Sequence, residues 1–345
     1  MEKKQIDEFR RVLGTLPEQT PILNIEDLNK YPVDKSTWQE NEYGIKAGPF
    51  QFYEGVRGMS VETIDYPSNP YRLLFEFCVS TWGSEEYPTM WPRTKPEHRF
   101  EVVKGVLENK ALPLGNEALQ FSFIVRSASR AAFDQHARMR VGATFASQGV
   151  RDNSRLFAGF RVPNEIWRNK ETREELISSA LWLKKVYYLL TSGKKGNSFQ
   201  AARSVMTMNW THNYKWSVNY MSLKSYMARR LVASEQEDTV ATAILHWNEI
   251  NKRFPLLANY LRPKCDWAKK CLCHQDEYGK LFGSLFKGCG RFPETEHNYS
   301  TFNWSCTDYE TLEQQTGIHL PNPNEWKNYE KLEDLEEKDQ KLFKE

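Results

Sequence analysis

The sequence predicts an α+β fold with one main domain and an extension at each end. Two short stretches, 61–65 and 119–125, alternate apolar and polar residues in the manner of half-buried strands. Several longer stretches instead space their apolar residues at helical intervals. A chain of 345 residues, of which 40% are hydrophobic, is also long and apolar enough to bury a substantial core.

Residues 1–57 combine charge with many aromatic and turn-forming residues. We expect them to form an ordered extension that wraps around the core, because Trp and Tyr side chains at this density need a surface to bury against. From residue 58 the pattern changes. The strand at 61–65 then ends at a turn marked by Pro67 and Pro70.

Helical spacing of apolar residues recurs along the rest of the chain. A helix over 129–140 would set Gln135 and Arg138 on adjacent turns, pointing to one side. From residue 261 the chain is rich first in cysteine and then in aromatic and polar residues, and we expect the charged tail from Glu325 to be solvated helix or disorder. The predicted helices cover 71–79, 100–108, 129–140, 164–192 and 216–254, of which the last is the longest.

Composition excludes several classes of protein. Lys and Arg number 47 against 45 Asp and Glu, a net charge of +2, whereas proteins that bind nucleic acid usually have a strong basic excess. No apolar run approaches the ~20 residues that span a bilayer. The charged N-terminus lacks the apolar segment of a signal peptide. We therefore expect a soluble, cytoplasmic protein that binds neither nucleic acid nor membrane.

Five arginines lie close together and are interleaved with small residues. Arginine matches phosphate oxygens two at a time, and small residues allow a large planar ligand or a phosphate to approach the backbone. The alternative is a solvated helix face with ion pairs, which we favour for any single arginine but not for the group. Few carboxylates are near enough in sequence to pair with the group, since Asp134 and Asp152 are the only acidic residues between Arg126 and Arg155. The group comprises Arg126, Arg130, Arg138, Arg140 and Arg151.

Part of this stretch resembles the signature of the flavin-dependent thymidylate synthase family. That signature has a glutamine three positions before the first arginine of an R-H-R motif, and a serine-containing loop with an arginine further on. Gln135, Arg138 and Arg140 match its spacing. Met139 stands at the histidine, and the downstream loop is reduced to Gly149-Val150-Arg151.

Two further blocks keep the spacing of the same family. In 202–209, Arg203 stands where the family has an arginine before a short apolar segment and an asparagine. The run Trp-Ser-Val-Asn-Tyr-Met-Ser-Leu at 216–223 resembles the family's W-T-x-N-x-R-S-L helix start. The resemblance covers roughly 59–255. The same register places Asn219, Arg230, Gln236 and Asp238 on family positions.

The resemblance implies a fold with an antiparallel or mixed sheet and long helices. It implies a catalytic domain at 58–260, flanked by the 1–57 extension and a cysteine-containing appendage at 261–345. The implied reaction is FAD-dependent transfer of a one-carbon unit from methylenetetrahydrofolate to C5 of a pyrimidine deoxynucleotide. We expect dUMP to be this nucleotide and NADPH to be the reductant. It further implies a homotetramer whose active sites lie between subunits.

The resemblance also implies roles for individual residues. Arg203 would hold the nucleotide phosphate and Arg230 would lie near the pyrimidine, with Arg230 and Gln135 beside the reaction. Gln135 and the loop with Gly149 and Arg151 would complete the nucleotide site. The residues expected to contact FAD are Arg138, Arg140, Asn219 and Ser225.

Several positions depart from the family pattern. Met139 replaces a histidine, Met221 an arginine and Ser225 an asparagine, and 111–117 lacks the family's histidines. Most of these positions touch FAD or folate in the family, whereas the nucleotide arginines are kept. Three hypotheses stay open: a divergent thymidylate synthase, a paralogue that makes a C5-hydroxymethyl dUMP or dCMP, and a non-catalytic nucleotide-binding homologue that has lost flavin.

Four of the six cysteines are crowded between 265 and 289. Clustered cysteines in a protein that lacks an export signal favour reduced thiols or a metal over disulfides. Their spacing differs from that of a standard zinc finger or ribbon, so a structural zinc and unligated thiols both stay open. The predicted zinc ligands are Cys265, Cys271, Cys273 and Cys289.

Overall fold

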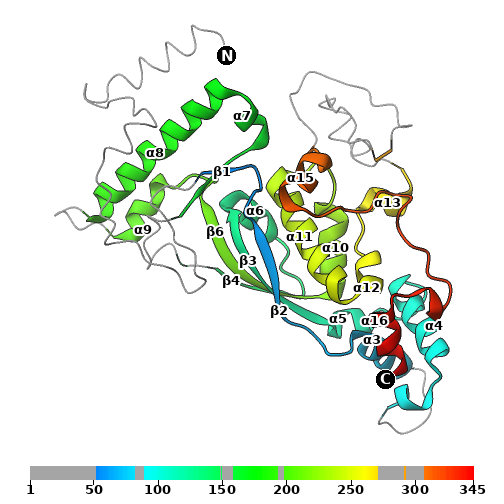
Figure 1. Ribbon diagram of the computed structural model, residues 1–345. Helices are drawn as coiled ribbons and strands as arrows, with labels where there is room; N and C mark the ends of the chain where they lie inside the picture. Colours follow the sequence, from blue (N-terminus) through cyan, green and yellow to red (C-terminus); the bar gives the residue numbers. More distant parts are fainter. Residues whose placement is uncertain are drawn as a thin grey trace, which may run out of the picture.

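A four-stranded antiparallel sheet lies at the centre of the molecule (Figure 1). Its strand order is β2-β3-β6-β4, and the α+β class predicted from the sequence is confirmed. The strands are β2 (Ser60–Asp65), β3 (Gln120–Ser129), β6 (Thr211–Asn219) and β4 (Ala143–Ser147). The computed structural model describes residues 52–81, 89–147, 149, 158–192, 198–270, 291–292 and 307–345.

The two central strands bury one face of the sheet. Alternate residues of β3 and β6 point into the core, as the two-residue period of a strand requires. Helix α11 (Glu237–Arg253), which is buried along most of its length, packs against β2 and β3 on this face. The side chains that meet there include Phe121, Phe123, Val125, Tyr214, Trp216 and Val218.

The single long helix predicted for 216–254 is wrong. Trp216 lies inside β6, and Asn219 ends the strand by accepting a hydrogen bond from Ser222 N at 2.9 Å, which caps helix α10 (Tyr220–Arg230). A turn then separates α10 from α11, and α12 (Pro255–Asn259) follows. The physical reason is the cap, because an asparagine in extended conformation starts a new helix and cannot sit inside one.

The predicted helix over 129–140 is shorter than expected. Helix α6 (Arg130–His136) begins at Ser129, whose hydroxyl accepts from Ala132 N at 2.9 Å. It ends at His136, where Ala137 N donates to Phe133 O at 2.7 Å, and the chain then turns through Gly142 at φ +61° to enter β4. Gln135 and Arg138 are therefore not on adjacent turns of one helix.

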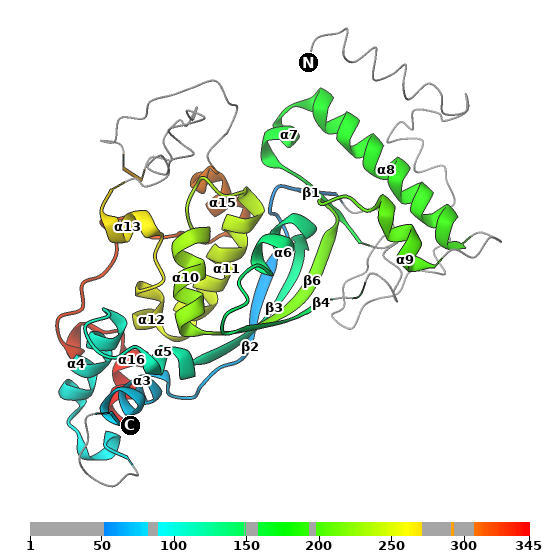
Figure 2. The same cartoon turned by 180° about the vertical axis from the view of Figure 1, so that it is seen from behind.

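A second, smaller core lies on the other side of the sheet from α10 and α11 (Figures 1 and 2). The helix predicted over 164–192 is two helices, α7 (Asn164–Arg168) and α8 (Lys170–Ser192), because Asn169 between them caps α8. Near them, β1 (Phe52–Glu54) pairs in parallel with β5 (Phe160–Val162). Residues 1–51 of the predicted wrapping extension lie outside the described residues. The helical segments α9 (Phe199–Ala202) and η3 (Arg203–Val205) pack against α8.

The C-terminal residues belong to the main core. Leu332, Leu335 and Phe343 are buried, so the expectation of a solvated or disordered tail from Glu325 is wrong. Helix α16 (Glu337–Lys344) packs on α3 (Pro70–Val79) and α4 (Pro96–Leu107), which confirm the predicted helices at 71–79 and 100–108. None of the described helices could cross a membrane. The remaining segments are η2 (Trp91–Arg93), α5 (Leu114–Ala118), α13 (Lys264–Ala268), α15 (Tyr309–Thr316) and η4 (Leu332–Asp334).

Candidate functional site

Arg230 and Gln135, the two residues predicted beside the reaction, lie side by side where α10 and α6 end. Arg230 Nη2 is 3.5 Å from the backbone oxygen of Gln135. Its Nη1 donates to Glu235 Oε2 at 2.6 Å, while the buried Nε has no hydrogen-bond partner in the described parts of the chain. The Arg230 side chain is only 13% exposed. A half-buried guanidinium with an unused donor is suited to bind a polar planar group.

The loop that carries Arg138 and Arg140 is fixed against the start of α10. Asn219 N donates to Gly142 O at 2.9 Å, and Ser222 Oγ donates to Val141 O at 2.6 Å. A side chain at Gly142 would collide with the Asn219 amide, whose nitrogen is 2.2 Å from an ideal Cβ. The structure therefore fixes the end of the loop that carries Arg138 and Arg140 against Asn219 and Ser222 at the start of α10.

Arg138 and Arg140 are exposed, and within the described ranges neither has an ion-pair or hydrogen-bond partner. Ser225 is also exposed, one turn beyond Ser222 on α10. Val141, which follows Arg140 in the same loop, is 85% exposed. Two exposed cations beside an exposed apolar side chain form a surface suited to a diphosphate with an attached ring system.

Met139 faces the other way. Its side chain is partly buried and packs against the main core, so it offers the loop's outer surface no polar group. Arg126 and Arg130, in contrast to Arg138 and Arg140, are paired with Glu62 at 2.8 Å and Asp134 at 3.0 Å. The Arg130–Asp134 pair fits the alternative of a helix face with ion pairs, whereas Arg126 lies on β3 with a side chain that is only 16% exposed.

The remaining predicted nucleotide residues are less closely joined. Arg203 lies exposed at the start of η3, and the described residues show no hydrogen bond or ion pair from it to Gln135 or Arg230. Gly149 is half-buried just beyond β4. Arg151 lies outside the described residues. Within one chain, Arg230 therefore contacts Gln135, whereas Arg203 forms no hydrogen bond or ion pair with either of these described residues.

His136, which follows Gln135 in the sequence, lies in a layer of buried histidines and aromatic rings. His136 stacks on Tyr226, with ring centroids 4.5 Å apart, and shares a hydrogen bond with the Tyr214 hydroxyl at 2.7 Å. The ring of His246 lies 5.2 Å from that of His136. Burial lowers the pKa of His136 well below its usual value and that of His246 to about 4, so both imidazoles are neutral at pH 7.

A small polar cavity of about 60 Å³ lies near the N-terminus of α11. Arg161 and Asp238 line it, both are buried, and Arg161 Nη2 and Asp238 Oδ1 have no hydrogen-bond partner among the described residues. Burial lowers the pKa of Arg161 to about 10, although Asp238 counteracts this. Ser129 donates to the other oxygen of Asp238. The cavity is large enough for a water molecule between the two charges.

A larger cavity of about 350 Å³ adjoins Glu235. Its lining includes the carboxylates of Glu165, Glu235, Glu237 and Asp308, but only one arginine, Arg168. Such a lining repels phosphate, so this cavity is not a candidate nucleotide site.

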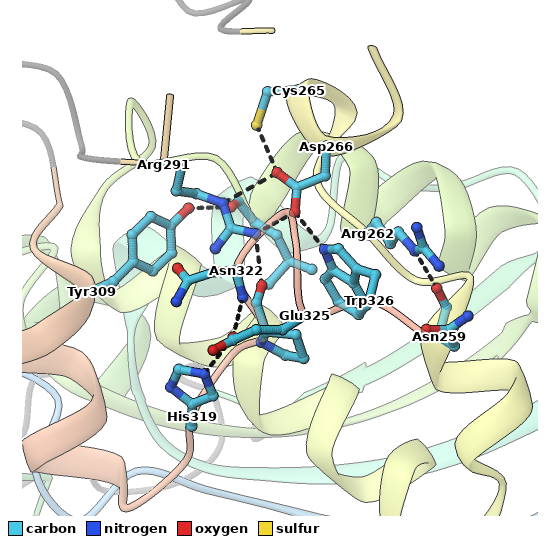
Figure 3. A network of polar contacts seen from close by, with 12 residues as sticks. Asn259, Arg262, Cys265, Asp266, Arg291, Tyr309, His319, Asn322, Glu325 and Trp326 are labelled. Atoms are coloured by element: carbon cyan, nitrogen blue, oxygen red, sulfur yellow. Dashed lines mark hydrogen bonds and ion pairs between the residues drawn. The ribbon is translucent and has the colours of Figure 1, made fainter. Parts of the chain in front are cut away.

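The predicted zinc ligands cannot be brought together from the described residues. Cys271, Cys273 and Cys289 lie outside them, and within them no group of three or more His, Cys, Asp or Glu side chains could hold a metal. Cys265 is buried and its thiol donates to Asp266 Oδ1 at 3.4 Å (Figure 3). The structural zinc stays a prediction.

Comparisons with known proteins identify the family of this chain. The chain matches the family described as thymidylate synthase complementing protein over residues 73–256. A comparison with curated proteins found no match. Among similar solved structures are two of the UMP/dUMP methylase PolB from Streptomyces cacaoi, one bound with 5-Br dUMP and one with 5-Br UMP.

The PolB structures are 16% and 15% identical to this chain, cover 61% and 62% of it and 96% of their own chains, and have a TM-score of 0.47 in both cases. The family match, in contrast, spans more than half of the chain and contains Gln135, Arg203 and Arg230. The chain belongs to the family of thymidylate synthase complementing proteins.

Proposed function

We propose that this protein is an FAD-dependent enzyme that transfers a one-carbon unit from methylenetetrahydrofolate to C5 of a pyrimidine deoxynucleotide, with dUMP as the first candidate and NADPH as reductant. Family membership supports the C5 chemistry at a coarse level. The observation that carries the proposal is the pair of Gln135 and Arg230, with a buried donor still unused at Arg230 Nε.

The nucleotide would bind at this pair. The carbonyl oxygens of a uracil ring accept hydrogen bonds, and the guanidinium of Arg230 donates them in one plane. Arg203 would neutralise the phosphate, since it is exposed. The neutral, buried His136 and His246 lie under this site and add no charge that would disturb a neutral base.

The loop from Arg138 to Gly142 fits FAD. Arg138 and Arg140 would hold its diphosphate, and Asn219 would contact it while it fixes the loop at Gly142. Ser225 would contact the cofactor from the exposed side of α10. When bound, FAD supplies the redox chemistry of the transfer, and the protein binds, orients and excludes water.

A second candidate function is nucleotide binding without flavin. The position of Met139 favours it, because a side chain packed into the core cannot replace the polar contact of the family's histidine. Absorbance of the purified protein separates the two candidates, since bound FAD is yellow.

We also propose that the active unit is a homotetramer in the cytoplasm, where folate and NADPH are available. The exposed loop at Val141 supports a site completed by a neighbouring subunit, and so does the lack of a hydrogen bond or ion pair between the described residues Arg203 and Arg230. Light scattering on the purified protein gives the mass of the assembly. A monomeric, fully active protein would overturn this part of the proposal.

The decisive experiment is a single-turnover reaction with FAD, NADPH and methylenetetrahydrofolate. Either dUMP or dCMP is added, and the product mass is measured. A product heavier by a methyl group supports the proposed reaction, and one heavier by a hydroxymethyl group supports the hydroxymethylase alternative. If FAD binds and neither nucleotide changes mass, the proposed reaction is wrong.

The nucleotide residues can be tested separately by calorimetry. We expect Arg203→Ala and Arg230→Ala each to weaken dUMP binding by about 1.5–3 kcal/mol, the contribution of a charge-assisted hydrogen bond. Arg57→Ala is the matched control, because Arg57 is 55% exposed and its ion pair among the described residues is with the nearby Glu54 at 2.8 Å. Affinity that is unchanged in both Arg203 and Arg230 variants would rule out this nucleotide site.

A further inference from the structure

The turn after Arg230 is held by residues from the C-terminal end of the chain. Thr307 N donates to Ala233 O and Thr307 Oγ1 donates to Glu235 O, both at 2.7 Å. The hydroxyl of Tyr309 donates to Leu231 O. Three carbonyls of the α10–α11 turn thus accept hydrogen bonds from a segment that lies outside the 73–256 family match.

These hydrogen bonds reach carbonyl groups at and just beyond the end of α10. The last carbonyls of an α-helix have no partner within the helix, so they need donors from elsewhere. Within the turn, the described backbone bonds include Glu235 N to Val232 O at 3.1 Å and Leu231 N to Met227 O at 3.0 Å. Thr307 and Tyr309 therefore supply donors that fix the direction in which the chain leaves α10.

Glu235 transmits the position of the turn to Arg230. Its carboxylate lies 2.6 Å from Arg230 Nη1, and its backbone oxygen accepts from Thr307. The position of the Glu235 backbone determines where its carboxylate holds the guanidinium. The buried Nε of the same guanidinium has no hydrogen-bond partner among the described residues, and its Nη2 lies 3.5 Å from the backbone oxygen of Gln135.

Tyr309 is itself held by a buried charge network (Figure 3). The guanidinium of Arg291 lies over the Tyr309 ring, 5.3 Å from its centroid. Arg291 binds both oxygens of the buried Asp266 and donates to Pro321 O at 2.8 Å, while Trp326 Nε1 donates to Asp266 at 2.6 Å. Such a paired, hydrogen-bonded buried charge fixes geometry, because removing one partner is strongly unfavourable.

We propose that Thr307 and Tyr309 are positioning residues for Arg230 in nucleotide binding. This inference rests on the proposed function, in which Arg230 binds the pyrimidine. The C-terminal segment holds the α10–α11 turn, the turn holds Glu235, and Glu235 orients the guanidinium before the nucleotide arrives. Pre-orientation of this kind raises affinity because fewer groups have to be ordered on binding.

The test measures dUMP affinity by calorimetry on the full-length, FAD-supplemented protein. Tyr309→Phe and Thr307→Val each remove one hydroxyl donor and keep the side-chain shape. We expect the dissociation constant of dUMP to rise about fivefold in each variant, the effect of one hydrogen bond. The control is Tyr71→Phe, which removes a tyrosine donor to Asp339, 2.5 Å away, between α3 and α16 and leaves the turn alone.

A double-mutant cycle separates positioning from a general loss of stability. If Tyr309 acts through Arg230, then Tyr309→Phe has no further effect on affinity once Arg230→Ala is present. An equal loss in both backgrounds, or a loss as large in Tyr71→Phe, overturns the inference. So does unchanged affinity in Tyr309→Phe and Thr307→Val while Arg230→Ala weakens binding. If the unmodified protein binds neither dUMP nor UMP, the proposed function fails first, and the inference with it.

Discussion

His246 lies at the centre of the buried aromatic layer beneath the candidate nucleotide site. Its Nδ1 donates to Thr242 O at 2.7 Å, and its Nε2 has no hydrogen-bond partner in the described parts of the chain. The rings of Phe123 and Trp216 lie 4.8 Å and 5.0 Å from it. Charging this imidazole would place a cation among aromatic rings away from water, and this burial lowers its pKa to about 4, although the hydrogen bond to Thr242 and the charge of Glu249 counteract it.

The lowered pKa of His246 predicts a loss of stability in acid. An unfolded histidine takes up a proton near pH 6.5, whereas the folded one does so near pH 4, so the unfolded state binds more protons between these values. The contribution of His246 to the free energy of unfolding is therefore complete above about pH 6.5. It falls by about 3 kcal/mol as the pH drops towards 4. Urea denaturation at intervals from pH 7.5 to 4.5 measures it.

The variant His246→Gln isolates this contribution. It removes the titrating group, so its free energy of unfolding should fall less steeply with acid than that of the unmodified protein. The comparison is needed because Asp339 acts in the opposite direction: burial raises its pKa to about 6, which adds stability as the pH falls. Equal slopes in both proteins would show that His246 is not responsible.

At the residue scale, the sequence could predict only those candidate-site residues that belong to a motif with recognisable spacing. The family resemblance predicts Gln135 and Arg230 in one site, and the structure places Arg230 Nη2 3.5 Å from the backbone oxygen of Gln135. Glu235 and Arg161 had no such signal. Arg161 lies in a three-residue strand and binds the backbone oxygens of Ser127 and Gly55, which only the folded chain brings to it.

At the scale of elements, the boundaries depend on single capping residues. Residues 211–219 alternate between buried and more exposed side chains, yet the sequence around Trp216 also contains apolar residues at helical spacing. Asn219 decides between the two, since its side chain caps α10 and its backbone nitrogen donates to Gly142 O. Pairing with β3 and β4, which is long-range, supplies the rest of the preference for a strand.

The contact between Gly142 and Asn219 predicts the effect of a single methyl group. Gly142→Ala has to adopt φ +61° and would also collide with the Asn219 amide, so either the loop or the cap of α10 must shift. We expect a loss of about 1–3 kcal/mol in the free energy of unfolding. If the loop binds FAD as proposed, FAD affinity should fall as well, because Arg138 and Arg140 move with it.

Gly317→Ala is the matched control for this substitution. Gly317 ends α15 at φ +70°, and apart from its two chain neighbours none of the described residues has an atom within 4 Å of an ideal Cβ there. Backbone strain alone acts at this position, so we expect a loss of only about 1 kcal/mol and unchanged FAD affinity. Equal effects of the two variants on FAD titration would show that the Gly142 loop does not position the cofactor.

At the scale of the whole molecule, apolar residues of the C-terminal segment pack into the same core as residues of the 73–256 family match. Phe343 of α16 stacks on Tyr71 of α3 with ring centroids 4.6 Å apart, and Arg99 donates to its backbone oxygen at 2.5 Å. Charge dominates the composition of this tail, which favours a solvated structure from sequence alone. The few apolar residues that decide otherwise are spaced too widely to form a recognisable pattern, and they are buried only because α3 and α4 provide a surface.

Removal of the Phe343 side chain tests how firmly the tail is docked. Phe343 is completely buried between Tyr71, Trp91 and Phe100, so Phe343→Ala should lower the free energy of unfolding by about 3–5 kcal/mol through lost burial and a cavity. Phe77→Ala, at a 43% exposed position of α3, should cost less than about 1 kcal/mol. Urea denaturation of both variants decides between two structures of the tail. A large difference means that α16 is part of the cooperative core, whereas equal, small losses mean that the tail is held as loosely as its charge predicts.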